Sequence, residues 1–223
     1  QAGEFEPTFL LFVESIDQIE VQVTDRPLVR WRRTSLGADT HGLEVEVDGS
    51  LTEQTWICLR RRGEISMRGR RKPRNYELAV ALRVDETNRP GFLHSYFPTS
   101  IPLPFSALMH ATLELDSNRK TIKDNSNLNE RVLRDLATFY AETLARLAKS
   151  KKLGNALDFL ARGAVFPTAL SDFESTVYRT ARQMPIVPTM KGGRVSAENG
   201  NVGPPGYETY LPTRLFGGLA KCR

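Results

Sequence analysis

Apolar and polar residues alternate with the period of a β-strand through much of the first 125 residues. Residues 18–23 alternate strictly, and residues 43–47 do so ahead of Asp48 and Gly49, a pair typical of a two-residue hairpin turn. Residues 77–84 are apolar enough for a central strand. The remaining strand-like runs are residues 9–13, 56–59, 92–97 and 111–115, and Pro98, Pro102 and Pro104 predict an irregular connection. The pattern predicts a sheet of mostly half-buried antiparallel strands.

The spacing of apolar residues changes to that of an α-helix after Asn125. The apolar stripe, with intervals of three or four residues, consists of Leu128, Val132, Leu136, Tyr140, Leu144 and Leu147. Asn127 and Glu130 predict a capping pair at the helix N-terminus. The cations that favour a helix C-terminus are Lys149, Lys151 and Lys152. We therefore expect one long amphipathic helix.

Two further helices and a small hairpin are predicted beyond the long helix. The helical stretches are residues 154–164 and 170–183. Residues 184–188 and 194–196 flank Lys191, Gly192 and Gly193 and read as a hairpin. The change of period near Asn125 divides the chain into a strand-rich part, residues 1–125, and a mainly helical part, residues 126–223.

The composition is that of a globular protein, because 40% of the 223 residues are hydrophobic and 26% are charged. No run of about eighteen apolar residues is present, so no membrane span is predicted. The chain opens Gln-Ala-Gly-Glu without a methionine or a secretory signal, and we expect it to be a piece of a longer protein. Neither Cys58 nor Cys222 lies in a C-x-x-C motif or beside a histidine, which favours a reducing, cytoplasmic setting.

The sequence contains no complete set of catalytic residues. None of His41, His94 and His110 belongs to an H-E-x-x-H motif, so no metal site is predicted. His94 and Ser95 are neighbours on a predicted strand and must point to opposite faces, so they cannot act as base and nucleophile. His110 is expected to be a packing or hydrogen-bonding residue. A phosphate-binding G-x-x-x-x-G-K-[ST] loop is also missing.

Positive charge is concentrated in one segment of a chain whose net charge is +5. The cations of this segment are Arg60, Arg61, Arg62, Arg68, Arg70, Arg71, Lys72 and Arg74. Two interpretations are open. The segment fits contact with phosphates of nucleic acid or nucleotide. It also fits a solvated loop between two strands, and the lack of interleaved aromatic residues favours the loop.

Three segments, through their order along the chain, resemble sacsin and its bacterial relatives. The central one begins with Pro102-Leu-Pro-Phe105, continues through HATLELDSNRKTI from His110 to Ile122, and leads directly into the long helix. Residues 9–21 resemble the segment that follows the nucleotide-binding domain in that family, and residues 184–196 resemble a later element with two prolines, glycine and a short strand. These proteins have nucleotide-binding domains of the GHKL type, similar to those of the heat-shock-protein-ninety chaperones.

The resemblance implies a role in ATP hydrolysis. In the chaperones, the domain after the nucleotide-binding domain carries a strand-to-helix loop whose arginine reaches the γ-phosphate of ATP, and related GHKL proteins use a lysine. Residue by residue, Asn118, Arg119 and Lys120 occupy that loop, with Arg119 the first choice for the phosphate contact, Lys120 the second and Asn118 in support. Arginine suits this role because its donors match phosphate oxygens. The alternative is that these are simply exposed turn residues.

The chain departs from the family pattern in two respects. The metal-coordinating asparagine, the D-x-G-x-G motif and the glycine-rich lid of the nucleotide-binding domain are missing from the 223 residues. The resemblance therefore implies that ATP and Mg²⁺ bind in the intact parent protein, on its own N-terminal domain, and that this chain alone does not bind ATP tightly. The loop reads Asn-Arg-Lys rather than Ser-Arg-Glu, which leaves open whether the arginine or the lysine makes the contact.

Taken together, these features predict an α/β or α+β transducer domain over residues 1–125, with a mixed sheet and a crossover helix resembling the ribosomal S five domain 2-like fold. A helical extension follows over residues 126–223. The expected function is that of a transducer in an ATP-driven, sacsin-like or chaperone-like protein, with the protein's own N-terminal nucleotide-binding domain as its partner and a client protein as a further candidate partner. The alternative is a passive module that docks a protein or nucleic acid through Arg68, Arg70, Arg71, Lys72 and Arg74.

Overall fold

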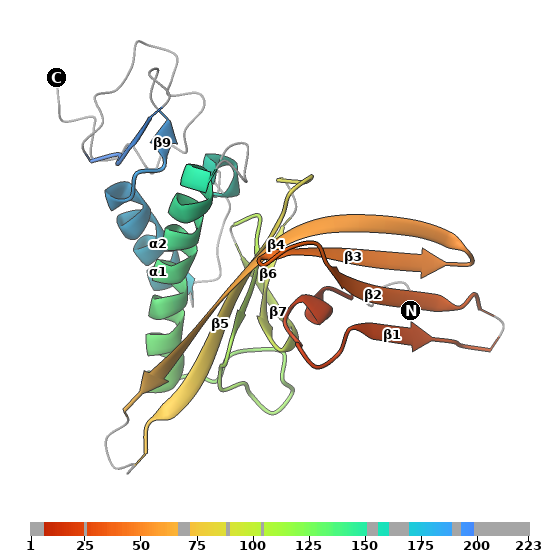
Figure 1. Ribbon diagram of the computed structural model, residues 1–223. Coiled ribbons are helices and arrows are strands. Elements are labelled where there is room, and N and C mark those ends of the chain that lie inside the picture. The colour runs from red at the N-terminus through yellow and green to blue at the C-terminus, as the bar shows by residue number, and fades with distance from the viewer. Residues whose placement is uncertain are drawn as a thin grey trace.

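The protein has an α+β fold in which an eight-stranded sheet is followed by two α-helices (Figure 1). The computed structural model describes residues 7–24, 26–66, 72–87, 90–103, 105–150, 156–160, 170–188 and 193–198. The strands of the large sheet are β1 (Gln18–Val21), β2 (Val29–Ser35), β3 (Thr40–Val47), β4 (Ser50–Ile65), β5 (Arg74–Arg83), β6 (Gly91–Ser95), β7 (Phe97–Leu103) and β8 (Leu108–Ala111). The other elements are η2 (Pro7–Leu11), α1 (Asn127–Ser150), η3 (Ala156–Phe159), α2 (Ser171–Gln183), β9 (Val187–Pro188) and β10 (Arg194–Val195).

The large sheet is mixed, with the strand order β1-β2-β3-β4-β5-β8-β6-β7. All neighbouring pairs are antiparallel except β6 and β8, which run parallel. The predicted crossover helix is wrong: among the described residues both α-helices follow β8, and the strand β7 rather than a helix joins the parallel pair. Figure 1 shows β1, β2 and β3 extending as an arm away from the helices.

Several predicted elements are confirmed. Asp48 and Gly49 have φ angles of 52° and 77°, as a tight hairpin turn between β3 and β4 requires. The long helix is α1, the third predicted helix is α2, and β9 pairs with β10 as the predicted hairpin. The described part of residues 154–164 contains only the 3-10 helix η3, and Lys151 and Lys152 lie outside the described residues.

Other local predictions are wrong. Residues 9–13 do not form a strand, because most of them belong to the 3-10 helix η2 and the turn that follows it. Pro98 and Pro102 lie inside β7, which is tolerated because β7 is an edge strand. Residues 92–97 form parts of two strands separated by Tyr96. Of residues 111–115, only Ala111 belongs to a strand, β8. The cap of α1 is Ser126 rather than Asn127, since the Ser126 hydroxyl accepts a hydrogen bond from the Asn129 backbone N–H at 3.3 Å.

The two faces of the sheet are covered by different parts of the chain. Side chains alternate across β4, so Ile57 and Leu59 face the helices, while Trp56 and Cys58 face the opposite side. On the helix side, α1 and α2 pack with β4 to β8 in one hydrophobic cluster. Residues from both sides of Asn125 contribute to this cluster, and the division of the chain into domains at residue 125 stays a prediction.

The opposite side of the sheet is covered by residues 7–16, which we call the N-terminal plug. Its four large apolar side chains are each at most 2% exposed and pack against Trp31 and Trp56 of the sheet; they are Phe9, Leu10, Leu11 and Phe12. Because they are consecutive, they cannot all point to one side of a strand, and the helical turn allows them all to be buried. The plug therefore completes a second hydrophobic cluster.

Two arginines of the sheet bind the carbonyl groups of the plug. The Arg33 guanidinium donates to the carbonyl oxygens of Leu10 at 2.6 Å, Val13 at 3.1 Å and Glu14 at 3.0 Å. Arg60 donates to those of Leu11 at 2.6 Å and Phe12 at 3.2 Å. The end of a short helix leaves such carbonyl groups without internal partners. The two arginines therefore make burial of the plug backbone compatible with its polarity.

We expect Arg33→Ala and Arg60→Ala each to lower the free energy of unfolding by about 2 to 3 kcal/mol, because each leaves buried carbonyl groups without donors. Arg32→Ala is the matched control, since Arg32 is more than half exposed and pairs with Glu44 on the other face. Its effect should stay below about 1 kcal/mol. Chemical denaturation measures the free energy of unfolding of all three variants. Equal losses of stability in Arg32→Ala and Arg33→Ala would contradict the role of the carbonyl contacts.

The thiol of Cys58 reports whether the plug is in place. It lies beneath the plug, 3.6 Å from the Leu11 carbonyl oxygen, and burial raises its pKa to about 11. In a Cys222→Ser background, we expect alkylation at pH 8 to be at least about 100-fold slower in the folded than in the unfolded chain. Arg60→Ala should accelerate it. Rapid alkylation of the folded protein in which Arg60 is intact would show that the plug does not cover the thiol.

Candidate functional site

The predicted phosphate-contacting residues lie together on one exposed loop between β8 and α1. Leu115 and Ile122 form an isolated antiparallel bridge, and we call residues 115–122 the arginine loop. Arg119 and Lys120 are exposed at its tip. Neither has an ion-pair partner among the described residues. The loop therefore presents two cations to the surroundings.

The backbone of the arginine loop is fixed by its own hydrogen bonds. Asp116 accepts from the Thr121 hydroxyl through its side chain and from the Arg119 N–H through its backbone carbonyl, the latter at 3.1 Å. The hydrogen bond from Thr121 lowers the pKa of the Asp116 carboxyl, with smaller contributions from backbone N–H groups of the loop. Asn118 Oδ1 accepts from the Lys120 N–H at 2.7 Å, so the side chain of Asn118 supports the turn.

Arg119 occupies a conformation that is uncommon for a residue with a side chain. Its φ angle is 58°, in the left-handed region. The loop is also tied to the sheet, because the Lys120 carbonyl oxygen accepts from the Ser100 N–H of β7 at 2.9 Å. These contacts restrict the backbone of Arg119 and Lys120, so only their side chains need to be ordered when an anion binds.

The base of the loop contains a buried asparagine that the sequence analysis did not identify. Asn129, in the first turn of α1, is 2% exposed. Its amide accepts from the Glu114 N–H at 2.8 Å, and it donates to the carbonyl oxygens of Glu114 at 2.8 Å and Lys123 at 3.2 Å. The one feature of the sequence that points to Asn129 is its place as a polar residue directly after Leu128, at the edge of the apolar stripe.

Glu114 joins this site to the basic segment. Its carboxylate accepts from the Ser126 hydroxyl at 2.8 Å and from Arg74, at the start of β5, at 2.5 Å. The hydrogen bond from Ser126, and then that from Arg74, lower the pKa of Glu114. In residues 68–74 of the basic segment, Lys72 is exposed and Arg74 is paired, while Arg68, Arg70 and Arg71 lie outside the described residues.

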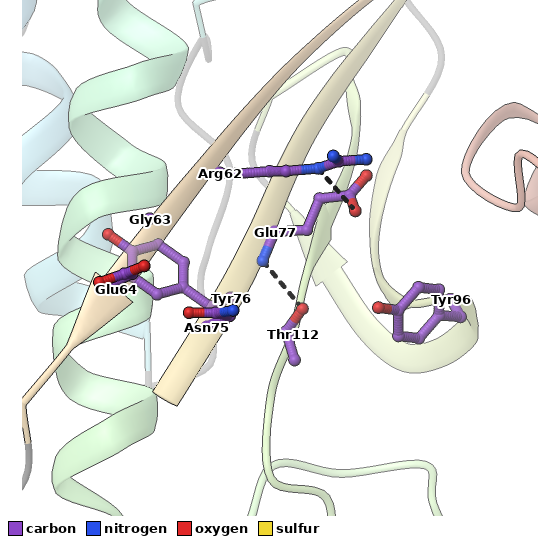
Figure 2. A pocket seen from close by; sticks show the side chains of 8 residues that line it. All are labelled: Arg62, Gly63, Glu64, Asn75, Tyr76, Glu77, Tyr96 and Thr112. Carbon is purple, nitrogen blue, oxygen red and sulfur yellow. Dashed lines mark hydrogen bonds and ion pairs between the residues drawn. The ribbon is translucent and has the colours of Figure 1, made fainter. Parts of the chain in front are cut away.

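An open pocket beside β5 collects polar side chains of both charges (Figure 2). Arg62 lies 3.9 Å from the Glu77 carboxylate, and the Glu77 N–H donates to the Thr112 hydroxyl at 3.0 Å. Figure 2 shows the ring of Tyr96 apart from this group. The arginine in the pocket is thus already matched by a carboxylate, and the pocket holds no pairing of a nucleophile with a base.

Two histidines are buried on the plug side of the sheet. His94 donates to the Phe92 carbonyl oxygen at 3.2 Å through Nδ1, while His110 Nδ1 accepts from the Tyr96 N–H at 2.9 Å. The Ser95 hydroxyl accepts from the Leu113 N–H at 3.4 Å, so His94 and Ser95 have separate partners. Burial lowers the pKa of His94 to about 4 and that of His110 to about 3. Both histidines are therefore neutral packing residues at pH 7, as expected for His110.

Among the described residues, no three acidic, histidine or cysteine side chains are grouped as a metal ion would require. Nor does any helix in the described part of the chain combine the length and hydropathy needed to cross a membrane. No protein-family model, curated protein or solved structure matches the chain.

We expect the protein to lose stability as the pH falls below 6.5. Unfolded histidine takes up a proton near that pH, whereas His94 and His110 stay neutral in the fold until their much lower pKa values are reached. Each therefore costs roughly 2 kcal/mol of stability at pH 5. Denaturation at pH 7.5 and pH 5 measures this loss. In His94→Leu the loss between the two pH values should shrink by roughly 2 kcal/mol, and an unchanged loss would contradict this assignment.

Proposed function

We propose that this chain is the transducer region of a larger GHKL-type ATP-binding protein, similar to sacsin and the heat-shock-protein-ninety chaperones, and that its arginine loop contacts the γ-phosphate of ATP. The observation that supports the proposal is the presentation of Arg119 and Lys120, which are exposed and without ion-pair partners among the described residues. They stand on a backbone held by hydrogen bonds. Cations without internal partners are available to an external anion.

The chemistry of the two side chains suits phosphoryl transfer. A guanidinium offers paired donors to phosphate oxygens and stabilises the charge that develops in the transition state, and an ammonium acts as a point charge. Because Arg119 is the residue with the left-handed backbone at the tip, we assign it the phosphate contact and Lys120 a supporting one. ATP and Mg²⁺ are held by the N-terminal nucleotide-binding domain of the parent protein.

In this proposal, hydrolysis depends on docking between domains. The cation reaches the nucleotide only when the transducer lies against the nucleotide-binding domain, so a client protein that changes this arrangement changes the rate. The mixed sheet is then the transducer domain resembling the ribosomal S five domain 2-like fold, with the helical extension after residue 125. The intact protein works in the cytoplasm, which the two isolated cysteines favour.

A passive docking module that uses the basic segment is the alternative. The described part of residues 68–74 favours it less, because Arg74 is paired with Glu114 and Lys72 is the one exposed cation described there. Salt-dependent binding of nucleic acid by the chain, lost when Arg68, Arg70 and Arg71 are replaced, would establish this function instead.

ATP hydrolysis by the intact protein tests the proposal. We expect Arg119→Ala to lower kcat by about 100-fold or more while ATP binding is retained, because the lost contact is strongest in the transition state. Lys120→Ala should have a smaller effect. Turnover and nucleotide affinity are measured side by side.

Arg134→Ala is the control, since Arg134 is an exposed cation on α1, away from the loop tip, and the change removes the same charge. Its kcat should equal that of the wild type. If Arg119→Ala and Lys120→Ala also leave kcat unchanged, the phosphate contact is excluded and the docking module becomes the better description.

A further inference from the structure

We propose that Asn129 is the positioning residue of the arginine loop, so that helix α1 determines where Arg119 is held. This inference rests on the proposed function, in which Arg119 contacts phosphate. Asn129 lies below the loop rather than at its tip, and it is almost completely buried. It acts on phosphate only through the backbone that it holds.

The amide of Asn129 bridges the two sides of the loop. Glu114 precedes the bridge residue Leu115, and Lys123 follows its partner Ile122. The side-chain oxygen accepts from the Glu114 N–H, and the side-chain NH₂ group donates to the carbonyl oxygens of Glu114 and Lys123. One rigid planar group thus bridges the two chain segments from which the loop emerges, beside their direct hydrogen bond from the Lys123 N–H to the Glu114 carbonyl oxygen at 2.9 Å, and ties both to α1.

The amide also connects the loop to a helix that cannot move independently of the core. Asn129 is followed by Val132 and Leu136, both fully buried against the sheet. A rotation or translation of α1 would therefore move the amide, and the loop base would have to follow or lose three hydrogen bonds. Buried polar groups that lose their partners cost free energy, so the loop is expected to follow.

A second group of contacts prevents Glu114 from shifting alone. Its carboxylate is held from one side by Ser126, at the N-terminus of α1, and from the other by Arg74 of β5. The Ser126 hydroxyl is in turn hydrogen bonded to the N–H of Asn129 at 3.3 Å. Helix, strand and loop therefore meet at Glu114, and Asn129 is the member of this group that contacts both sides of the loop.

Hydrogen exchange on the chain tests the positioning directly. Asn129→Asp keeps the shape and an acceptor but removes both donors, so the Lys123 carbonyl oxygen loses the Asn129 donor and the Glu114 carbonyl oxygen keeps only its hydrogen bond from the Lys123 N–H. We expect the amides of Arg119 and Thr121 to exchange at least about 10-fold faster, with those of β4 and β5 unchanged. Asn127→Ala is the control, because Asn127 is exposed two residues earlier in the same helix turn. It should leave the loop amides as they are.

ATP turnover by the intact protein tests the functional consequence. We expect Asn129→Asp to lower kcat by about 10- to 100-fold with little change in KM, since a displaced cation is lost mainly from the transition state. In an Arg119→Ala background, the same change should have no further effect. A purely structural role would instead multiply the two losses.

The outcomes separate this inference from the proposed function. Unchanged exchange of the loop amides, or losses of kcat that multiply, would overturn the role of Asn129. An Arg119→Ala protein with the kcat of the wild type would overturn the proposed function. The hydrogen-exchange result alone would then decide whether Asn129 holds the loop. If Asn129→Asp fails to fold, Ser126→Ala removes the hydroxyl that donates to Glu114 and accepts from the Asn129 N–H, and it should produce a smaller change of the same kind.

Discussion

The fold depends on the way in which two arginines satisfy the backbone of the N-terminal plug. Burying four consecutive apolar side chains on one side of the sheet also buries the carbonyl groups between them. Without donors, that burial would cost free energy for each carbonyl group. Arg33 of β2 and Arg60 of β4 provide the donors from the sheet itself. The sheet therefore gives the plug both an apolar surface and its polar partners, and the second hydrophobic cluster can form.

The exclusion of water by the plug determines the chemistry beneath it. Phe12 packs against the rings of His94 and His110, with centroid separations of 4.9 and 5.6 Å. In this dry setting the neutral imidazole is favoured, and only a neutral His110 has an acceptor for the Tyr96 N–H. That hydrogen bond supports Tyr96 at a φ angle of 64°, in the turn between β6 and β7. A segment at the start of the chain thereby stabilises a turn about eighty residues later.

Local pattern was sufficient to predict an element where one side of it is buried and the other is solvated. This holds for α1, α2 and β3, and the turn at Asp48 and Gly49 followed from its own residues. β1 was predicted from its alternation although none of its side chains is buried. Local pattern fails where burial is decided by distant parts of the chain. The four apolar residues of the plug have no alternation from which helix and strand could be told apart. β2 was missed because its arginines interrupt the apolar pattern, and one of them, Arg33, points inward to the plug.

The candidate site divides in the same way. Arg119, Lys120 and Asn118 were found through a resemblance carried by consecutive residues, and the structure groups them on one loop. Asn129 could not be found by such means, because its importance arises from contacts with residues 114 and 123, which its position in the helix does not indicate. The exposed tip and the buried base nevertheless require each other: a cation can be held toward an external anion only if the backbone behind it is fixed, and here that backbone is fixed by a polar group inside the core.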